Sequence, residues 1–176
     1  MRTKKIAAWL LSFLAAAATG CAQEPRPSPP ATADVTLAGK TISIKYSRPS
    51  MRGRKIMGGL VPYGQVWRTG ANAATMLTTP VNLTIGGTAV PAGKYTLYTL
   101  PGENSWKLII NKQTGQWGTE YDEGQDLARV NMKVSQTSSP TEQFLISWNK
   151  QSQSEATLLM AWENTRASVP VVATGK

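Results

Sequence analysis

The sequence predicts an all-β fold: an antiparallel β-sandwich or flattened barrel of about 8–10 strands with one long ordered loop. Apolar and polar residues alternate with a period of two through most of the chain, which is typical of strands that bury one face. Turn signals recur at regular spacing, and no segment of useful length carries a helical stripe. Strands are expected at residues 42–46, 81–85, 88–90, 94–100, 106–110, 128–134, 144–148, 156–162 and 169–172.

The first half of the expected sheet is defined by alternation and by turns. Ile42, Ile44 and Tyr46 share one face of the first strand. Gly86-Gly87 ends the next alternating segment and accepts the positive φ of a tight hairpin. Pro91-Ala92-Gly93 then indicates a second turn, after which a strand rich in tyrosine and threonine follows.

The second half continues the same pattern. Trp106, Trp148 and Trp162 fall on core-facing positions of three strands, and residues 111–115 turn the chain. Pro170 lies in the short last strand. Because proline cannot donate to a central ladder, we expect this strand at an edge of the sheet.

The N-terminal residues 1–20 are predicted to be a signal peptide. Arg2, Lys4 and Lys5 precede an apolar run over residues 6–18. That run is too short for a membrane-spanning helix, which needs about 20 residues. The leader is therefore excluded from the expected fold.

Cys21 is the single cysteine and follows the leader directly. The segment Ala18-Thr19-Gly20-Cys21 resembles a lipoprotein processing box, so Cys21 is expected to be acylated and to anchor the protein to a membrane, at the outer membrane or its periplasmic face. Plain secretion as a soluble protein is the alternative. Residues 21–33 are then a lipidated cysteine and a proline-rich tether, and residues 34–173 are the β-sandwich domain.

Composition excludes several kinds of chemistry. The chain has no histidine, and acylation of Cys21 would leave no thiol. Ser-His-Asp catalysis, histidine general bases and thiolate metal sites are excluded, and we expect no cofactor and no metal. The 19 Lys and Arg residues against 10 Asp and Glu give a net charge of +9. Outside the cytoplasm, such a charge favours anionic lipids, small molecules or glycans as partners and not nucleic acid.

Residues 47–74 interrupt the strand pattern. This segment is long for a connection, is rich in glycine, and contains enough apolar residues to predict an ordered loop packed over the sheet. No acidic residue lies between Lys45 and Gly102. Guanidinium groups suit carboxylate and phosphate, so the loop is a candidate anion-binding surface. Its cations are Arg48, Arg52, Arg54, Lys55 and Arg68.

The alternative is that these cations pair internally with the one acidic cluster, which consists of Glu120, Asp122, Glu123 and Asp126. The two interpretations are compatible, because a basic loop over an acidic one forms the walls of one cleft. The acidic cluster could also hold calcium or act as a glycosidase pair, although it lacks the spacing of a helix-loop-helix calcium site. Among the tryptophans outside the leader, only Trp67 and Trp117 lie in expected loops and are candidates for stacking on a ligand.

Several short motifs between residues 46 and 122 can be considered as one set. They are Tyr46 to Pro49, Gly53 to Ile56, Leu60 to Asn72 (LVPYGQVWRTGAN), Pro91 to Leu97, Pro101 to Glu103, Asn111 to Gly118 and Tyr121-Asp122. In these motifs the chain resembles the bacterial DUF-2911 domain family, over nearly all of residues 34–172. The resemblance implies an exported β domain and carries no assigned activity.

We therefore expect a non-enzymatic envelope lipoprotein whose β domain binds an anionic ligand or glycan through the long loop. A structural or interaction component of an envelope assembly is the second hypothesis, and a histidine-independent hydrolase with carboxylates, or with a Ser-Lys or tyrosine-based site, is the third. No catalytic residue is assigned. The candidate ligand-binding residues are Arg48, Arg52, Arg54, Lys55, Trp67, Arg68, Asn72, Trp117, Tyr121 and Asp122.

Overall fold

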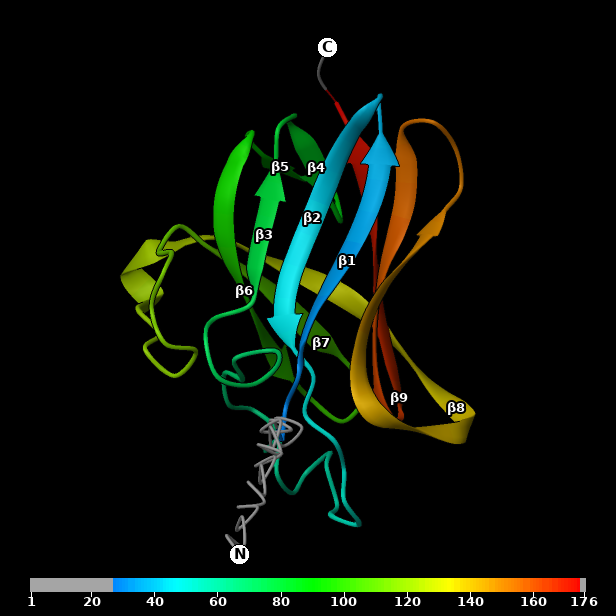
Figure 1. The fold of residues 1–176 in the computed structure, drawn as a ribbon. Coiled ribbons are helices and arrows are strands. Elements are labelled where there is room, and N and C mark those ends of the chain that lie inside the picture. Colours follow the sequence, from blue (N-terminus) through cyan, green and yellow to red (C-terminus); the bar gives the residue numbers. More distant parts are fainter. Residues whose placement is uncertain (1–26, 175–176) are drawn as a thin grey trace, which may run out of the picture.

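The computed structural model describes residues 27–174 and confirms the all-β prediction (Figure 1). The predicted signal peptide and acylated Cys21 lie outside the described residues. Nine strands and one short 3₁₀ helix make up the domain. They are β1 (Pro30–Leu37), β2 (Lys40–Ser47), β3 (Met76–Thr79), β4 (Leu83–Ile85), β5 (Thr88–Val90), β6 (Gly93–Pro101), β7 (Trp106–Asn111), η1 (Glu123–Gln125), β8 (Asp126–Lys150) and β9 (Glu155–Ala173).

All nine strands form one antiparallel sheet in the order β1-β2-β3-β6-β7-β8-β9-β4-β5. β1 and β5 are the two edges, so the sheet is not closed into a barrel. The long β8 pairs with β7 up to Met132 and with β9 from Lys133 onward. The sheet thereby folds back on itself, and β1 contacts β8 and β9 across the core (Figure 1).

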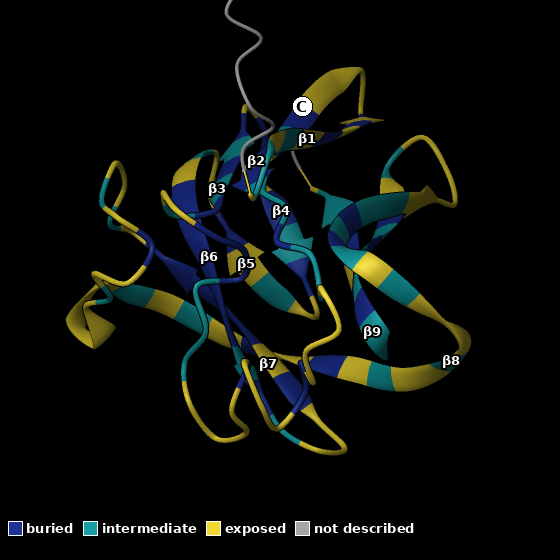
Figure 2. Ribbon diagram, turned by 60° about the horizontal axis from the view of Figure 1, so that its bottom comes forward, coloured by how far each residue is buried: buried dark blue, intermediate teal, exposed yellow. Residues whose placement is uncertain are grey.

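The core lies between the two halves of the folded sheet. Ile42, Ile44 and Tyr46 are buried as their alternation predicted, and so are Trp106 and Trp162. The period of two is visible as bands of buried and exposed residues along β8 (Figure 2). Alternation is thus a reliable guide to which face of each strand is buried, because successive side chains point to opposite sides of the sheet.

The range predicted for the proline-rich tether, residues 21–33, overlaps the first strand. β1 begins at Pro30 and pairs with β2 from Pro30 opposite Ser47 onward. Ala33 is already buried in the core. Small residues at alternate positions hid this part of the strand, and Pro30 is tolerated because it opens an edge strand.

Two further expectations about strands were wrong. The four-residue β3 was missed, because such a short segment carries almost no periodicity. The expected edge strand at 169–172 is instead the end of β9, which lies between β8 and β4. Pairing with β8 ends at Ser168 and pairing with β4 begins at Val171, so Pro170 falls between the two ladders, where its missing N–H costs no ladder bond.

The long loop is ordered, as predicted. Ile56 and Val61 are completely buried, and Met57 is nearly so. Isolated bridges join the loop to the rest of the domain at Ser50 and at Trp67. In Figure 1 the loop covers one end of the folded sheet, away from the tip of the β1–β2 hairpin. Within residues 27–174, no helix is long and apolar enough to span a membrane.

Candidate functional site

Two carboxylates on β8 and β9 accept hydrogen bonds from the backbone of the long loop. Glu163 of β9 accepts hydrogen bonds from the N–H groups of Met57, at 3.0 Å, and Ile56, at 3.5 Å. Glu142 of β8 accepts one from the N–H of Arg52 at 2.9 Å. These carboxylates therefore bind the loop through its peptide groups and do not neutralise its cationic side chains.

Trp67 fixes the middle of the loop to the core. Its peptide exchanges two hydrogen bonds with Thr99 of β6, of 2.8 and 3.0 Å. Its ring stacks on Trp162, with centroids 5.6 Å apart and an interplanar angle of 20°, and meets Phe144 edge-on at 4.9 Å. The half-buried Trp67 therefore forms part of the core and also part of the surface above it.

A cavity of about 310 Å³, here called hollow 1, opens beside these two tryptophans. Arg52, Arg54 and Arg68 line it together with Trp67 and the almost completely buried Trp162. The remaining lining residues are Pro27, Ser28, Pro49, Ser50, Leu60, Gly70 and Ala71. Three predicted cations and one predicted aromatic residue thus converge on one opening.

The three arginines of hollow 1 bond only to backbone carbonyls. Arg54 donates to Met51 and Ser50, at 2.9 and 2.7 Å, and Arg68 Nε donates to the carbonyl of Gly70 at 3.3 Å. Arg52 Nη2 donates to Pro27 at 3.4 Å. Over residues 27–174 no ion pair involves a cation of the loop. Their positive charges are therefore not compensated within this part of the chain.

Arg52 also carries backbone strain. Its φ is +49°, a left-handed conformation that is uncommon for residues other than glycine. Such strain is held by surrounding contacts and is often found at functional sites. Here the hydrogen bond from the Arg52 N–H to Glu142 holds the turn in place beside hollow 1.

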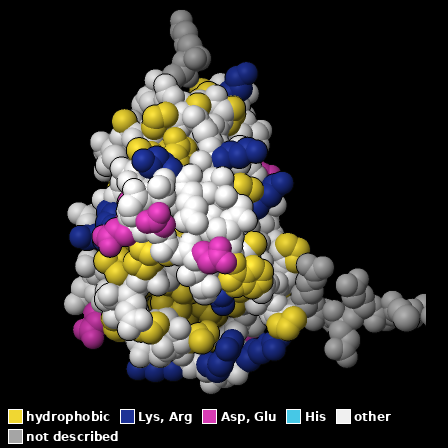
Figure 3. All heavy atoms as spheres, turned by 90° about the vertical axis from the view of Figure 1, so that its left-hand side faces the viewer, with side chains coloured by type: hydrophobic (Ala, Val, Ile, Leu, Met, Phe, Trp, Pro, Cys, Tyr) yellow, Lys and Arg dark blue, Asp and Glu magenta, His cyan; other side chains and the backbone are white. Residues whose placement is uncertain are grey.

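A second cavity of about 260 Å³, here called hollow 2, adjoins the first. Leu60, Trp67 and Arg68 line both cavities. Figure 3 shows this side of the molecule, where hydrophobic side chains gather below acidic ones and basic side chains follow the lower edge. The other lining residues of hollow 2 are Pro62, Val66, Tyr98, Gly118, Thr119 and Tyr121.

The other predicted residues lie outside both hollows. Arg48 is partly buried and donates from Nε to the carbonyl of Phe144 at 3.1 Å, and Lys55 is exposed. Asn72 donates to the carbonyl of Ser28 at 3.5 Å. Trp117 is 51% exposed, and its backbone bridges to Ala73. These four side chains do not join the convergent set.

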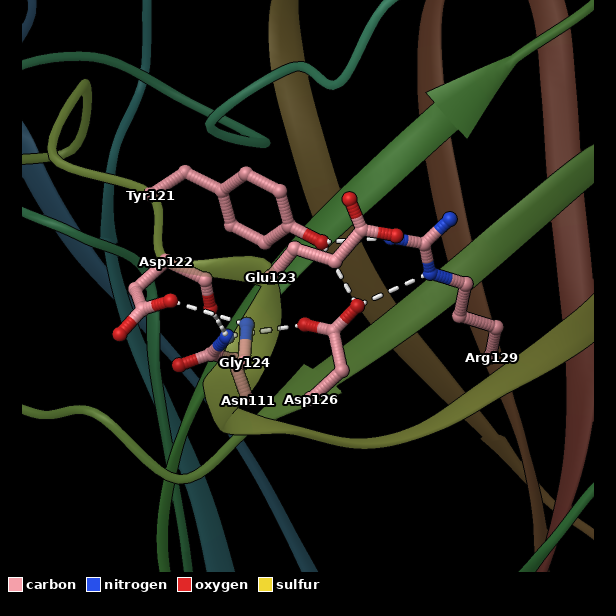
Figure 4. Close-up of polar contacts among 7 residues, drawn as sticks. All are labelled: Asn111, Tyr121, Asp122, Glu123, Gly124, Asp126 and Arg129. Carbon is pink, nitrogen blue, oxygen red and sulfur yellow. Dashed lines mark hydrogen bonds and ion pairs between the residues drawn. The ribbon is translucent and has the colours of Figure 1, made fainter.

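The acidic cluster has its own cation, and the alternative of pairing with the loop was wrong. Arg129 of β8 forms ion pairs with Glu123 at 2.7 Å and with Asp126 at 2.9 Å (Figure 4). Asp126 also accepts from the Tyr121 hydroxyl at 2.6 Å and from Asn111 Nδ2 at 2.8 Å. Arg129 was not among the expected partners because it lies on an expected strand, although its spacing of three residues from Asp126 is a signal for pairing.

Asp122 has a local structural role. Its carboxylate accepts a hydrogen bond from the N–H of Gly124 at 2.9 Å and caps η1 (Figure 4). Within the described part of the chain, no group of three or more acidic or cysteine side chains is arranged to hold a metal ion.

The two tyrosines of hollow 2 are held protonated. Burial, followed by the hydrogen bond to Asp126, raises the pKa of Tyr121 to about 12. Burial also raises the pKa of Tyr98 above its usual value. A raised pKa disfavours a phenolate that acts as general base or nucleophile, so these hydroxyls are better suited to hydrogen bonding.

Leu60, Trp162 and Tyr98 line the hollows but were absent from the predicted set. Alternation places Trp162 and Tyr98 on strands as core residues, and both are almost completely buried. It does not show that cavities open beside them.

A family model described as a protein of unknown function, DUF2911, matches residues 28–171. No curated protein and no solved structure matches the chain.

Proposed function

The chain belongs to the DUF2911 family, and on that premise we propose that it is a non-enzymatic module that binds an anionic ligand in hollow 1. One observation carries the proposal: Arg52, Arg54 and Arg68 line a single cavity, and no carboxylate within residues 27–174 pairs with them. Guanidinium groups present planar forks that match carboxylate and phosphate oxygens.

The half-buried ring of Trp67 supports a ligand that carries a ring. Trp67 lines hollow 1 together with the three arginines, while Trp162 is almost completely buried. A sugar or another flat group packs well against an indole, while the arginines hold its acidic substituent. An acidic glycan or a phosphorylated small molecule fits both features.

We also propose that the module is exported and attached to the cell envelope through acylated Cys21, at the outer membrane or its periplasmic face. The basic leader, the short apolar run and the single cysteine support this location. A soluble secreted form is the alternative. Labelling cells with a fatty-acid probe should mark the wild-type chain and leave the Cys21→Ser variant unmarked.

A role in an envelope assembly is the second candidate function. Leu60, Tyr63 and Trp117 are exposed large hydrophobic residues. Exposed aromatic and aliphatic groups of this kind often contact partner proteins. The hydrolase alternative has less support, because Asp126 is already engaged by Tyr121, Asn111 and Arg129.

Anion titration tests the proposed binding directly. We expect phosphate or glucuronate to raise the melting temperature of the wild-type chain, since a ligand that binds only the folded state stabilises it by mass action. The double variant Arg52→Gln with Arg54→Gln should lose this shift. The matched control, Lys107→Gln with Lys133→Gln, removes two exposed cations that lie away from hollow 1 and should retain it. An equal loss of the melting-temperature shift in both variants would show that the shift depends on net charge and not on hollow 1.

A further inference from the structure

Hollows 1 and 2 are neighbours with different chemistry. Leu60, Trp67 and Arg68 line both, so these three side chains form the ridge between them. Hollow 1 adds two further cations, Arg52 and Arg54. Hollow 2 has no cation except Arg68 among its lining residues.

The walls of hollow 2 are mostly apolar or aromatic. Pro62 and Val66 of the loop face Tyr98 and Tyr121, whose rings meet edge-on with centroids 4.8 Å apart. The Tyr121 hydroxyl donates to Asp126, and the Tyr98 hydroxyl donates to the carbonyl of Glu120 at 3.2 Å. Since these hydroxyl protons are already engaged within the protein and Tyr98 is almost completely buried, hollow 2 offers mainly the half-buried ring of Tyr121 and aliphatic carbon.

The position of Arg68 on the ridge depends on Gly118. A Cβ at Gly118 would lie 2.9 Å from Cδ and 3.2 Å from Cβ of Arg68. The stem of Arg68 therefore lies flat against a residue that has no side chain. Its Nε donates to Gly70, while its two terminal nitrogens make no hydrogen bond among the described residues. This geometry places a half-buried charged group where the basic hollow and the apolar hollow meet.

We propose that the ligand is an elongated amphiphile, with an anionic head in hollow 1 and an apolar tail that crosses the ridge into hollow 2. The inference rests on the proposed function and specifies its ligand class. Arg52 and Arg54 hold the head, and Arg68 contacts the ligand where the head joins the tail. An alkyl or aryl phosphate or carboxylate meets this description.

A series of ligands with one head and growing tails tests the inference. Inorganic phosphate, ethyl phosphate, butyl phosphate and hexyl phosphate are titrated into the chain from residue 22 onward, which contains every strand. We expect the dissociation constant to fall about fourfold for each added methylene that enters hollow 2. Heptanoate, tested beside hexyl phosphate, shows which anionic head is preferred.

A variant in which a tryptophan side chain fills hollow 2 tests where the tail binds, and a second tryptophan variant outside the hollow is its matched control. Thr119 is exposed and lines hollow 2, so Thr119→Trp should block the tail without disturbing the core. Thr114 is exposed on the same connection and lines neither hollow, so Thr114→Trp should behave as wild type. We expect Thr119→Trp to bind phosphate normally and to lose the gain with tail length.

The outcomes separate the two proposals. Arginine-dependent binding of phosphate with no gain along the series, or with the same gain in Thr119→Trp, overturns the amphiphile and leaves the anion site. Absence of binding by any member of the series overturns both. A gain with tail length that survives Arg52→Gln with Arg54→Gln overturns the joint placement of head and tail.

Discussion

Two charged regions both contribute lining residues to hollow 2 and use their charges in opposite ways. In the connection between β7 and β8, Glu123 and Asp126 are paired with Arg129, and Asp126 also binds Tyr121 and Asn111 (Figure 4). In residues 47–74 the apolar side chains enter the core, while the arginines of hollow 1 bond only to carbonyl groups. In the first region the charged side chains stabilise the fold by pairing with one another. In the second region the positive charges have no acidic partner among the described residues and are available to a ligand.

The largest expected effect concerns the apolar side of the loop. Trp67→Ala removes a ring that packs between Trp162 and Phe144, so we expect the free energy of unfolding to fall by about 3 kcal/mol. Urea denaturation measures it. The control is Trp117→Ala, which removes a 51% exposed ring and should change stability by less than about 0.5 kcal/mol. Equal effects would contradict the assignment of Trp67 to the core.

The second effect concerns the paired charges. Asp126→Ala leaves the Tyr121 hydroxyl without its acceptor and removes one of the two acidic partners of Arg129 and one of the two acceptors of the buried Asn111 amide. We expect a loss of about 2 kcal/mol in unfolding free energy. Asp34→Ala removes an exposed carboxylate of β1 and serves as the control. A wild-type melting temperature for Asp126→Ala would show that the network adds nothing to stability.

The third effect sharpens the contrast, because it should be small. Arg52→Gln with Arg54→Gln removes exposed side chains but keeps the peptide N–H of Arg52 that binds Glu142. We expect less than about 1 kcal/mol of lost stability, since surface substitutions of this kind have little effect. A loss as large as that of Asp126→Ala would mean that these arginines are internal struts.

The smallest effect is the titration of Tyr121. Its folded pKa is about 12 against an ordinary value of 10, so its contribution to stability is full below about pH 10 and is lost as the pH rises toward 12. Ultraviolet absorbance of phenolate should show Tyr121 and Tyr98 ionising later than an ordinary tyrosine in the wild type. Tyr121→Phe should lack the Tyr121 step, and ionisation of all tyrosines near pH 10 would contradict the burial of these two rings.

The sequence was sufficient to predict most of the strands and to predict that the loop is ordered, because both depend on local pattern. Alternation identified the core face at Ile42, Ile44 and Tyr46, and the apolar content of residues 47–74 predicted packing. β1 was not predicted, because alanine and proline carry little hydrophobic contrast, and β3 was too short to show a period.

The candidate site was only partly predictable, because the path of the loop is set by distant residues. The Glu163 carboxylate accepts a hydrogen bond from the N–H of Met57, which lies 106 positions earlier in the sequence. That contact helps to decide that Arg52 and Arg54 reach hollow 1 while Lys55 does not. The partner of the acidic cluster was missed for a related reason, since Arg129 reaches Glu123 only through the turn that η1 makes.

Arginine side-chain NMR during a phosphate titration tests the availability of the loop's charges most directly. Signals of the Nε–H groups, assigned from single Arg→Lys variants, should shift with phosphate for Arg52, Arg54 and Arg68 and stay fixed for Arg129. If all four signals remain still, or if Arg129 moves together with the others, the contrast between available and internally paired charge is contradicted.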